Sequence, residues 1–214
     1  MNIQLPAIYP ITDTRLSGLS HAVQVEELIA GGATLVQLRE KHAGPRDFYE
    51  DAREALAIAR AHSVKLIIND RADVALALGA DGVHLGQDDM PPAEARKILG
   101  DDAIIGYSTH DIGQAVEALK HPVDYIAIGP VYGTTTKENP GKTVGLEGLK
   151  RVREAIGDFP LVAIGGINQG NLRPVFDAGA DSAAVISDLF TPPSGISRKL
   201  FDLREIANKI TPNG

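Results

Sequence analysis

The side chains best suited to chemistry in this 214-residue chain come directly after short apolar runs. An amide and two cations occupy alternate positions in residues 37–41, and carboxylates follow two later runs, in residues 69–71 and 87–89. Cations can hold an anion, and a few carboxylates that leave room for water and a substrate phosphate are what Mg²⁺ favours. These residue types therefore indicate a magnesium-assisted site for phosphorylated small molecules.

Residues 37–41 would present cations on one face of an extended strand. Alternation along the strand points Gln37, Arg39 and Lys41 to one face, and Leu38 and Glu40 to the other. The alternative is a solvated strand end whose charges pair with neighbouring acids. We favour the first interpretation because Gln37 would lie well inside the strand.

Asp70 and Asp89 are the candidate metal ligands, because they follow two neighbouring strands whose ends would meet. Each of them could instead cap the N-terminus of a helix, and Asp89 is well placed for that role just before Pro91 and Pro92. The sequence leaves both interpretations open.

Hydroxyl and imidazole groups follow the fifth run, in Ser108, Thr109 and His110. His84 lies in the middle of the fourth run, where we expect a buried, hydrogen-bonded histidine and not a catalyst. We assign no role to His110.

Residues 129–145 form a long segment after the sixth run, with glycines and prolines. It carries Thr134, Thr135, Thr136 and Lys137, and it could order around an anion as an active-site lid does. A plain surface loop is the alternative.

The last two runs end in Gly165-Gly166 and in Ile186-Ser187. In many barrels these two strand ends hold a phosphate with backbone N–H groups, and glycine permits a close approach. The alternative for the glycine pair is a tight turn.

These residues need a scaffold of parallel strands, and the apolar runs supply eight candidates. The expected strands are residues 7–12, 34–39, 65–69, 82–85, 103–107, 124–129, 161–165 and 182–187. Helical patterns lie between them, in residues 20–30, 45–61, 92–99, 112–119, 146–156 and 171–178, and one more amphipathic helix follows residues 191–197. Ser20, Asp111 and the Pro91-Pro92 pair mark helix starts.

Strands that alternate with helices imply parallel pairing, and eight such units predict an α/β fold, a (β/α)8 TIM barrel. An open doubly wound sheet is the alternative. A repeated Gly-Ala-Asp, at residues 79–81 and 179–181, closes a helix and opens a strand each time. Nothing divides the chain, so we expect a single domain over residues 1–214.

The composition excludes several classes of protein. Hydrophobic residues make up 43% of the chain and charged residues 23%, which is typical of a protein that buries a core. No apolar run is long enough for a membrane span, no signal peptide is evident and there is no cysteine, so we expect a cytoplasmic protein without a membrane partner. The net charge of −7 argues against a nucleic-acid partner.

The number of anion sites narrows the chemistry. One phosphate belongs at the last two strand ends, and a more highly charged group belongs among Arg39, Lys41, Lys137 and the metal. Two phosphorylated substrates, of which one loses diphosphate, would need this arrangement.

Together these motifs resemble the thiamine-phosphate synthase family, from residues 9–13 to Ile186-Ser187. The resemblance implies a transferase of thiamine biosynthesis that joins 4-amino-5-hydroxymethyl-2-methylpyrimidine diphosphate to hydroxyethylthiazole phosphate and releases diphosphate, with Mg²⁺. It implies that the pyrimidine diphosphate is bound by Gln37, Leu38, Arg39, Glu40, Lys41, Asn69, Ser108 and Lys137. The thiazole phosphate would be bound by Thr134, Thr135, Thr136, Gly166, Ile186 and Ser187. Metal binding would belong to Asp70 and Asp89, and catalysis to Arg39, Lys41, Ser108 and Lys137.

Two residues depart from the family pattern. Asp188 stands where a small neutral residue is expected and could repel a phosphate, unless it turns toward solvent or caps the next segment. Tyr107 is bulkier than expected and could narrow the pyrimidine pocket. The competing functions are a thiazole tautomerase that needs no metal, a non-catalytic thiamine-phosphate binder and a phosphosugar isomerase.

Overall fold

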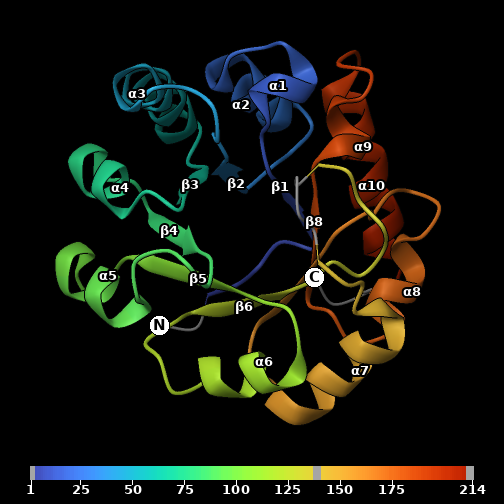
Figure 1. Cartoon of the computed structure of the whole chain (residues 1–214). Helices are drawn as coiled ribbons and strands as arrows, with labels where there is room; N and C mark the ends of the chain where they lie inside the picture. The colour runs from blue at the N-terminus through green and yellow to red at the C-terminus, as the bar shows by residue number, and fades with distance from the viewer. Residues whose placement is uncertain (1–2, 137–140, 211–214) are drawn as a thin grey trace.

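Eight parallel strands form a barrel in the computed structural model, which describes residues 3–136 and 141–210. The strands are β1 (Ile8–Pro10), β2 (Leu35–Leu38), β3 (Lys65–Asn69), β4 (Gly82–Leu85), β5 (Ile104–Thr109), β6 (Tyr125–Ile128), β7 (Leu161–Ile164) and β8 (Ser182–Val185). They pair in the order β1-β8-β7-β6-β5-β4-β3-β2, and Figure 1 shows them surrounded by helices.

The barrel is nearly closed, because β1 and β2 meet through little more than one bridge. This bridge joins Ile11 and Gln37, and beside it the N–H of Thr12 donates to the carbonyl of Gln37 at 2.9 Å. The predicted (β/α)8 barrel is therefore confirmed, and the open doubly wound sheet is wrong.

All of the expected helices are present, and the ends of those with an expected range match it or shift by one residue. The helices are α1 (Thr14–Ser17), α2 (His21–Ala30), α3 (Pro45–Ala61), α4 (Ala72–Leu78), α5 (Pro92–Leu99), α6 (Ile112–Ala118), α7 (Gly145–Ile156), α8 (Leu172–Asp177), α9 (Ser187–Phe190) and α10 (Ile196–Ile210). Ser20 and Asp111 cap α2 and α6 with their side chains, as predicted. Helices α1, α4 and α9 were not expected from the sequence, and α10 was expected without a range.

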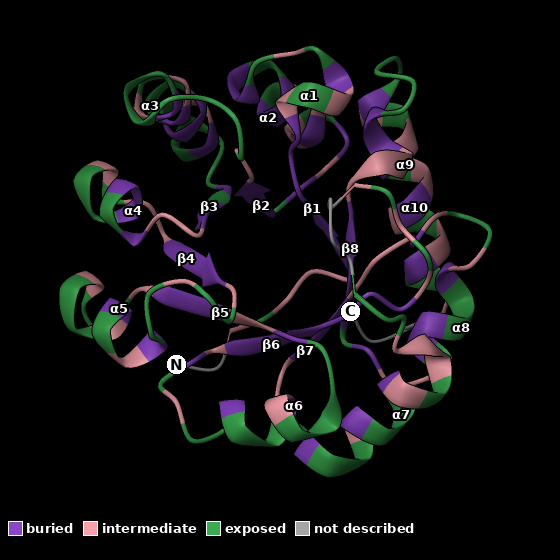
Figure 2. Ribbon diagram, viewed as in Figure 1, coloured by how far each residue is buried: buried purple, intermediate pink, exposed green. Residues whose placement is uncertain are grey.

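Apolar side chains pack in two layers on either side of the strands. Leu66 and Ile68 of β3 contact the layer beneath the helices, whereas Ile67 between them contacts the layer inside the barrel. Burial of both faces explains why the strands read as continuous apolar runs. Figure 2 shows buried residues along the strands and on the inward sides of the helices.

The two Gly-Ala-Asp segments are equivalent turns at the end of the barrel where the strands begin. Gly79 and Gly179 have φ of 63° and 97°, a left-handed conformation that ends a helix without steric cost. The following Asp81 and Asp181 accept the N–H of Leu66 and of Leu161, each at 2.8 Å. Both segments therefore close a helix and open a strand, as predicted.

No helix within residues 3–136 and 141–210 is both long and apolar enough to cross a membrane.

Candidate active site

A cavity of about 470 Å³ lies where the strands end, and every strand, or the residue just after it, contributes to its lining. This is the end at which barrel enzymes bind their substrates. Three groups of side chains line it: charged residues after β2, β3 and β4, polar residues inside the barrel, and hydroxyls and glycines after β6, β7 and β8.

The charged group centres on two carboxylates and a lysine. The ammonium group of Lys41 forms an ion pair with Asp70. Burial raises the pKa of Asp89, and the neighbouring Asp70 carboxylate raises it further, so the two acids lie side by side. Neighbouring carboxylates that repel each other are stabilised by a cation between them.

Neither acid caps a helix. The carboxylate of Asp89 accepts the N–H of Gly86 at 2.6 Å, whereas Pro91 precedes α5 without a side-chain cap. Arg71, and not Asp70, occupies the position before α4. The structure therefore contradicts the helix-cap alternative for both residues.

Asp70 holds a strained backbone conformation. Its φ is 61°, a left-handed value that is uncommon outside glycine and that aspartate tolerates better than most residues. Its N–H donates to the carbonyl of His84 at 2.8 Å, which fixes the turn after β3 against β4. Strain of this kind is typical of functional sites, where it aims a side chain.

Arg39 lines the cavity but is already paired. Its Nη1 donates to the carboxylate of Asp13 at 2.7 Å, and this carboxylate also accepts the N–H groups of Arg15 and Leu16 at the start of α1. Asp13 could not be assigned this role from the sequence, because its pairing with Arg39 spans the seam between β1 and β2.

Leu38 and Glu40 face away from the cavity, as the alternation predicted. Leu38 is fully buried in the layer beneath the helices. The Glu40 carboxylate accepts the hydroxyl of Thr14 at 2.7 Å and the N–H of His42 at 2.6 Å. The resemblance implied that these two residues bind substrate. Their side chains point away from the cavity, so only their main-chain atoms could contact a substrate.

Asn69 ends β3 inside the cavity lining. Its side-chain nitrogen is buried and has no hydrogen-bond partner among the described residues. A buried donor without a partner costs free energy, and a ligand oxygen would satisfy it.

Glycines shape the opposite side of the cavity. Gly166 has a φ of 64°, and a Cβ there would stand 2.5 Å from the carbonyl oxygen of Gly133. Thr134, Thr136, Ile186 and Ser187 also line the cavity there.

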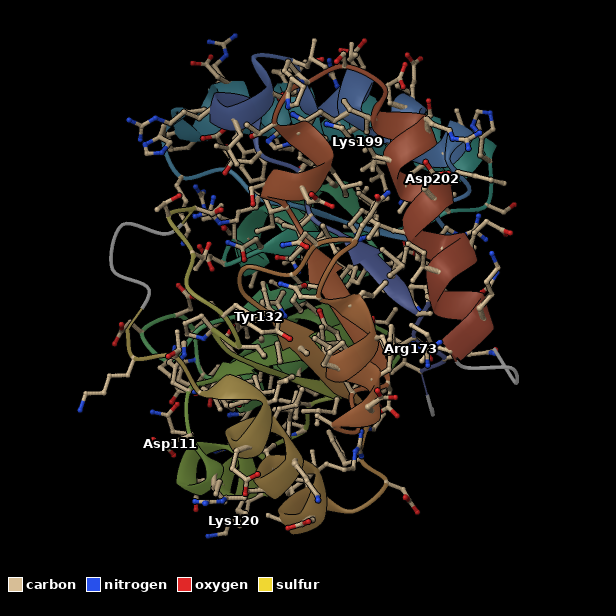
Figure 3. All side chains as sticks on the ribbon, turned by 90° about the vertical axis from the view of Figure 1, so that its right-hand side faces the viewer. Asp111, Lys120, Tyr132, Arg173, Lys199 and Asp202 are labelled. Carbon is tan, nitrogen blue, oxygen red and sulfur yellow. The ribbon has the colours of Figure 1, made fainter. Side chains whose placement is uncertain are left out.

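Thr135 is exposed and does not line the cavity, although the resemblance included it in the thiazole site. Lys137 lies outside the described residues. Tyr132, labelled in Figure 3, lies two residues before Thr134. Its hydroxyl donates to the carbonyl of Asn171 at 3.2 Å.

Neither departure from the family pattern reaches the cavity. Tyr107 packs against the layer beneath the helices, with its ring 6.3 Å from that of His121, so the expected narrowing of the pocket is wrong. Asp188 lies in the short helix α9 and is not part of the lining.

Polar side chains inside the barrel form the floor of the cavity. His84 is buried and hydrogen-bonded, as predicted, between the hydroxyls of Tyr125 and Ser108. Burial lowers its pKa to about 4, so it is neutral near pH 7. Tyr9 and Tyr125 were missed, because apolar runs do not reveal which of their residues face the interior.

A family model and similar curated proteins identify one family. The sequence model of a family described as "Thiamine monophosphate synthase" matches residues 8–189. The chain is 49% identical over 181 residues to the thiamine-phosphate synthase of Chloroflexus aurantiacus, covering 84% of this chain and 83% of that protein. It is 51% identical over 181 residues to that of Clostridium novyi, covering 84% and 88%.

A solved structure is also similar. The thiamine phosphate pyrophosphorylase of Pyrococcus furiosus superposes with a TM-score of 0.85 at 37% identity, covering 95% of this chain and 96% of that one.

Proposed function

The chain belongs to the thiamine monophosphate synthase family, and from this premise we propose how its cavity holds two phosphorylated substrates and a magnesium ion. It is a transferase of thiamine biosynthesis that joins a pyrimidine diphosphate to a thiazole phosphate and releases diphosphate. The finer assignments are proposals, and all except that of Lys137 rest on where a residue lies in the cavity.

The diphosphate of the pyrimidine substrate occupies the charged side of the cavity. Lys41 and Arg39 lie there, and the unpartnered amide of Asn69 supplies a further donor. Gln37 and Ser108 line the same cavity closer to the barrel interior. We keep Lys137 in this group on the family resemblance alone.

Asp70 and Asp89 fit a magnesium ion. They are adjacent carboxylates at the mouth of the cavity, and the burial that raises the pKa of Asp89 leaves its charge poorly solvated. Among the described residues no group of three or more His, Asp or Glu could hold a metal. Two carboxylates suit Mg²⁺, because it usually takes few protein ligands and fills its shell with water and substrate phosphate. When bound, the ion neutralises charge on the departing diphosphate.

The thiazole phosphate occupies the side formed after β6, β7 and β8. The backbone there can approach a ligand closely because Gly165 and Gly166 carry no side chain. The hydroxyls of Thr134, Thr136 and Ser187 supply neutral donors. A monophosphate needs fewer cations than a diphosphate, so this side suits the smaller charge.

The reaction proceeds by departure of diphosphate before the new bond forms. The carbon–oxygen bond of the pyrimidine methylene breaks, both electrons leave with diphosphate, and the thiazole nitrogen then donates its electron pair to that carbon. The protein stabilises the leaving charge with Lys41, Arg39 and Ser108 and aligns the two rings. No nucleophilic side chain is needed.

The observation that carries the proposal is the asymmetry of the cavity, with cations and paired acids on one side and glycines and hydroxyls on the other. A thiazole tautomerase or a thiamine-phosphate binder would need only the second side. Phosphorylated molecules do not cross membranes unaided, which supports a cytoplasmic enzyme.

The test is to mix both substrates with the enzyme and measure diphosphate release with Mg²⁺ and with a chelator. We expect release with Mg²⁺ and recovery when excess Mg²⁺ is added after the chelator. Absence of release in the presence of Mg²⁺ would refute the transferase reaction, and equal release with chelator would refute the metal site.

A further inference from the structure

Five polar side chains are joined by hydrogen bonds across the floor of the cavity, and we call them the inner network. Gln37 Nε2 lies 3.1 Å from the hydroxyl of Tyr9, which lies 3.1 Å from the hydroxyl of Tyr125. That hydroxyl lies 2.9 Å from His84 Nδ1, and His84 Nε2 lies 2.8 Å from Ser108 Oγ. The inner network therefore runs without a gap from β2 to β5.

The strand register builds the centre of this network. His84 on β4 pairs with Gly106 on β5, and Gly106 pairs with Tyr125 on β6, so the three residues form one row. A Cβ at Gly106 would collide with the Tyr125 ring and hydroxyl and would stand 2.5 Å from His84 Nδ1. The glycine thus leaves the space in which Tyr125 and His84 meet and stack, with ring centroids 5.5 Å apart.

Gln37 sets the donor-to-acceptor order along the inner network. Its amide nitrogen can only donate, so the Tyr9 hydroxyl accepts there. Tyr9 is fully buried, and within the described residues its oxygen has one other hydrogen-bond contact, the hydroxyl of Tyr125. Because a buried hydroxyl proton without an acceptor is costly, Tyr9 donates to Tyr125.

The same donor-to-acceptor order continues from Tyr125 to His84. Tyr125 accepts from Tyr9, so its own proton goes to His84 Nδ1. A neutral imidazole carries one proton, which must then lie on Nε2 and point at Ser108 Oγ. The opposite direction would leave the buried Tyr9 proton without an acceptor in the part of the chain that the structure describes.

We propose that Tyr125 and His84 are positioning residues that fix the hydroxyl of Ser108 as a hydrogen-bond donor to the substrate. The Nε2–H tautomer of His84 occupies a lone pair of Ser108 Oγ, so the Ser108 proton cannot point at the histidine and is directed into the cavity. This inference rests on the proposed function, in which the diphosphate oxygens lie beside Ser108.

A fixed donor stabilises the leaving charge better than a freely rotating one, because no reorientation is needed as the charge develops. In the other tautomer, His84 Nε2 would accept the Ser108 proton. The serine oxygen would then present only lone pairs to an anion. The tautomer of one buried side chain therefore decides whether Ser108 attracts or repels diphosphate.

The tautomer can be measured without substrate, by NMR of protein labelled with ¹⁵N-histidine. Two-bond ¹H–¹⁵N correlations separate a protonated ring nitrogen from a bare one, and the His84→Asn variant identifies the signals of His84 among the six histidines. We expect a proton on Nε2 and none on Nδ1. A proton on Nδ1, or on both nitrogens, would overturn the proposal.

Two matched variants, Tyr125→Phe and Tyr9→Phe, test whether the hydrogen bond from Tyr125 holds the ring of His84. Tyr125→Phe removes the hydrogen bond to Nδ1, so the ¹⁵N signal of Nδ1 should move to that of a bare nitrogen without a partner. The ring of His84 is then held less firmly, and kcat for diphosphate release should fall about tenfold, as expected for the loss of one orienting hydrogen bond. Tyr9→Phe leaves Tyr125 free to donate to His84, so the tautomer should persist and the loss should be smaller. An unchanged Nδ1 signal in Tyr125→Phe, or equal losses of kcat in both variants, would count against the proposal.

The two proposals fail in different ways. If the native protein released no diphosphate, the proposed function would fall, and with it the substrate-facing role of Ser108. If it released diphosphate while His84 carried its proton on Nδ1, only the positioning role would fall.

Discussion

Asp70 and Asp89 follow different strands, yet their carboxyl groups lie so close that the charge of Asp70 adds to the effect of burial in raising the pKa of Asp89. Lys41, which contacts Asp70, and the N–H of Gly86, which donates to Asp89, partly offset the repulsion between the two acids. A divalent cation could take the place of Lys41 beside the two acids, or could bind next to it.

Removing either acid should therefore weaken the response to magnesium. For Asp70→Asn and Asp89→Asn we expect the Mg²⁺ concentration that gives half-maximal diphosphate release to rise by about tenfold or more, since one charged ligand is lost. Asp102→Asn is the control, because Asp102 is exposed just before β5 begins, at the other end of the barrel. An unchanged magnesium response in the two site variants would show that the metal binds elsewhere.

Alanine variants of Lys137 and His110 should differ in kcat. His110 lines the cavity, but its Nδ1 already contacts the carbonyl of Gly129 at 2.7 Å, which suits a structural role. We expect Lys137→Ala and Asp70→Ala to lower kcat about a hundredfold or more, because each removes stabilisation of the leaving charge, and His110→Ala to lower it far less. Equal losses in the three variants would contradict these roles.

Gly166→Ala should damage the thiazole side of the cavity. A Cβ there would meet the carbonyl oxygen of Gly133 at 2.5 Å, and the backbone has a φ of 64°. We expect a loss of about 1–3 kcal/mol in the free energy of unfolding, together with a higher KM for the thiazole phosphate. Gly133→Ala is the matched control, since a Cβ there meets nothing within 4 Å. Similar unfolding curves for the two variants would exclude the strain.

His84 should make the protein sensitive to acid. Its pKa is about 4 in the folded protein, below the ordinary value of 6.5, because burial disfavours the charged form. Between these values the unfolded chain binds a proton that the folded protein excludes, so stability falls as the pH drops through this window. At pH 5 the loss amounts to about 2 kcal/mol relative to neutral pH.

The measurement is chemical denaturation of the native protein and of His84→Gln at neutral pH and near pH 5. The drop in unfolding free energy between the two conditions should be smaller in the variant by about 2 kcal/mol. Parallel losses in both proteins would mean that His84 does not contribute to the acid sensitivity.

The sequence predicted the elements best where periodicity and end signals agree. The ranges of α3, α5, β3 and β4 match the predicted ones, and α3 and α5 both begin at a proline. Helix α4 (Ala72–Leu78) was given no range, because a short segment of apolar residues broken by one acid, Asp73, has no helical period to detect.

The site was predictable one residue at a time but not as an arrangement. Polar types at the strand ends identified Gln37, Asn69 and Ser108, which all line the cavity. The pairing of Arg39 with Asp13 depends on how the barrel closes, and the contact of His84 with Tyr125 depends on the register of three strands. The pairing register between strands is set by the whole fold, so it cannot be predicted from the sequence of one strand.

Gly106 also provides a marker for sorting related sequences. The inner network needs a strand position without a side chain between the histidine of one neighbouring strand and the tyrosine of the other. Family members that keep this glycine together with His84 and Tyr125 can set the same tautomer, whereas members with any larger residue there must orient their serine by another means. The residue at this position would therefore separate members that can form the inner network from members that cannot, and it can be read from sequence alone.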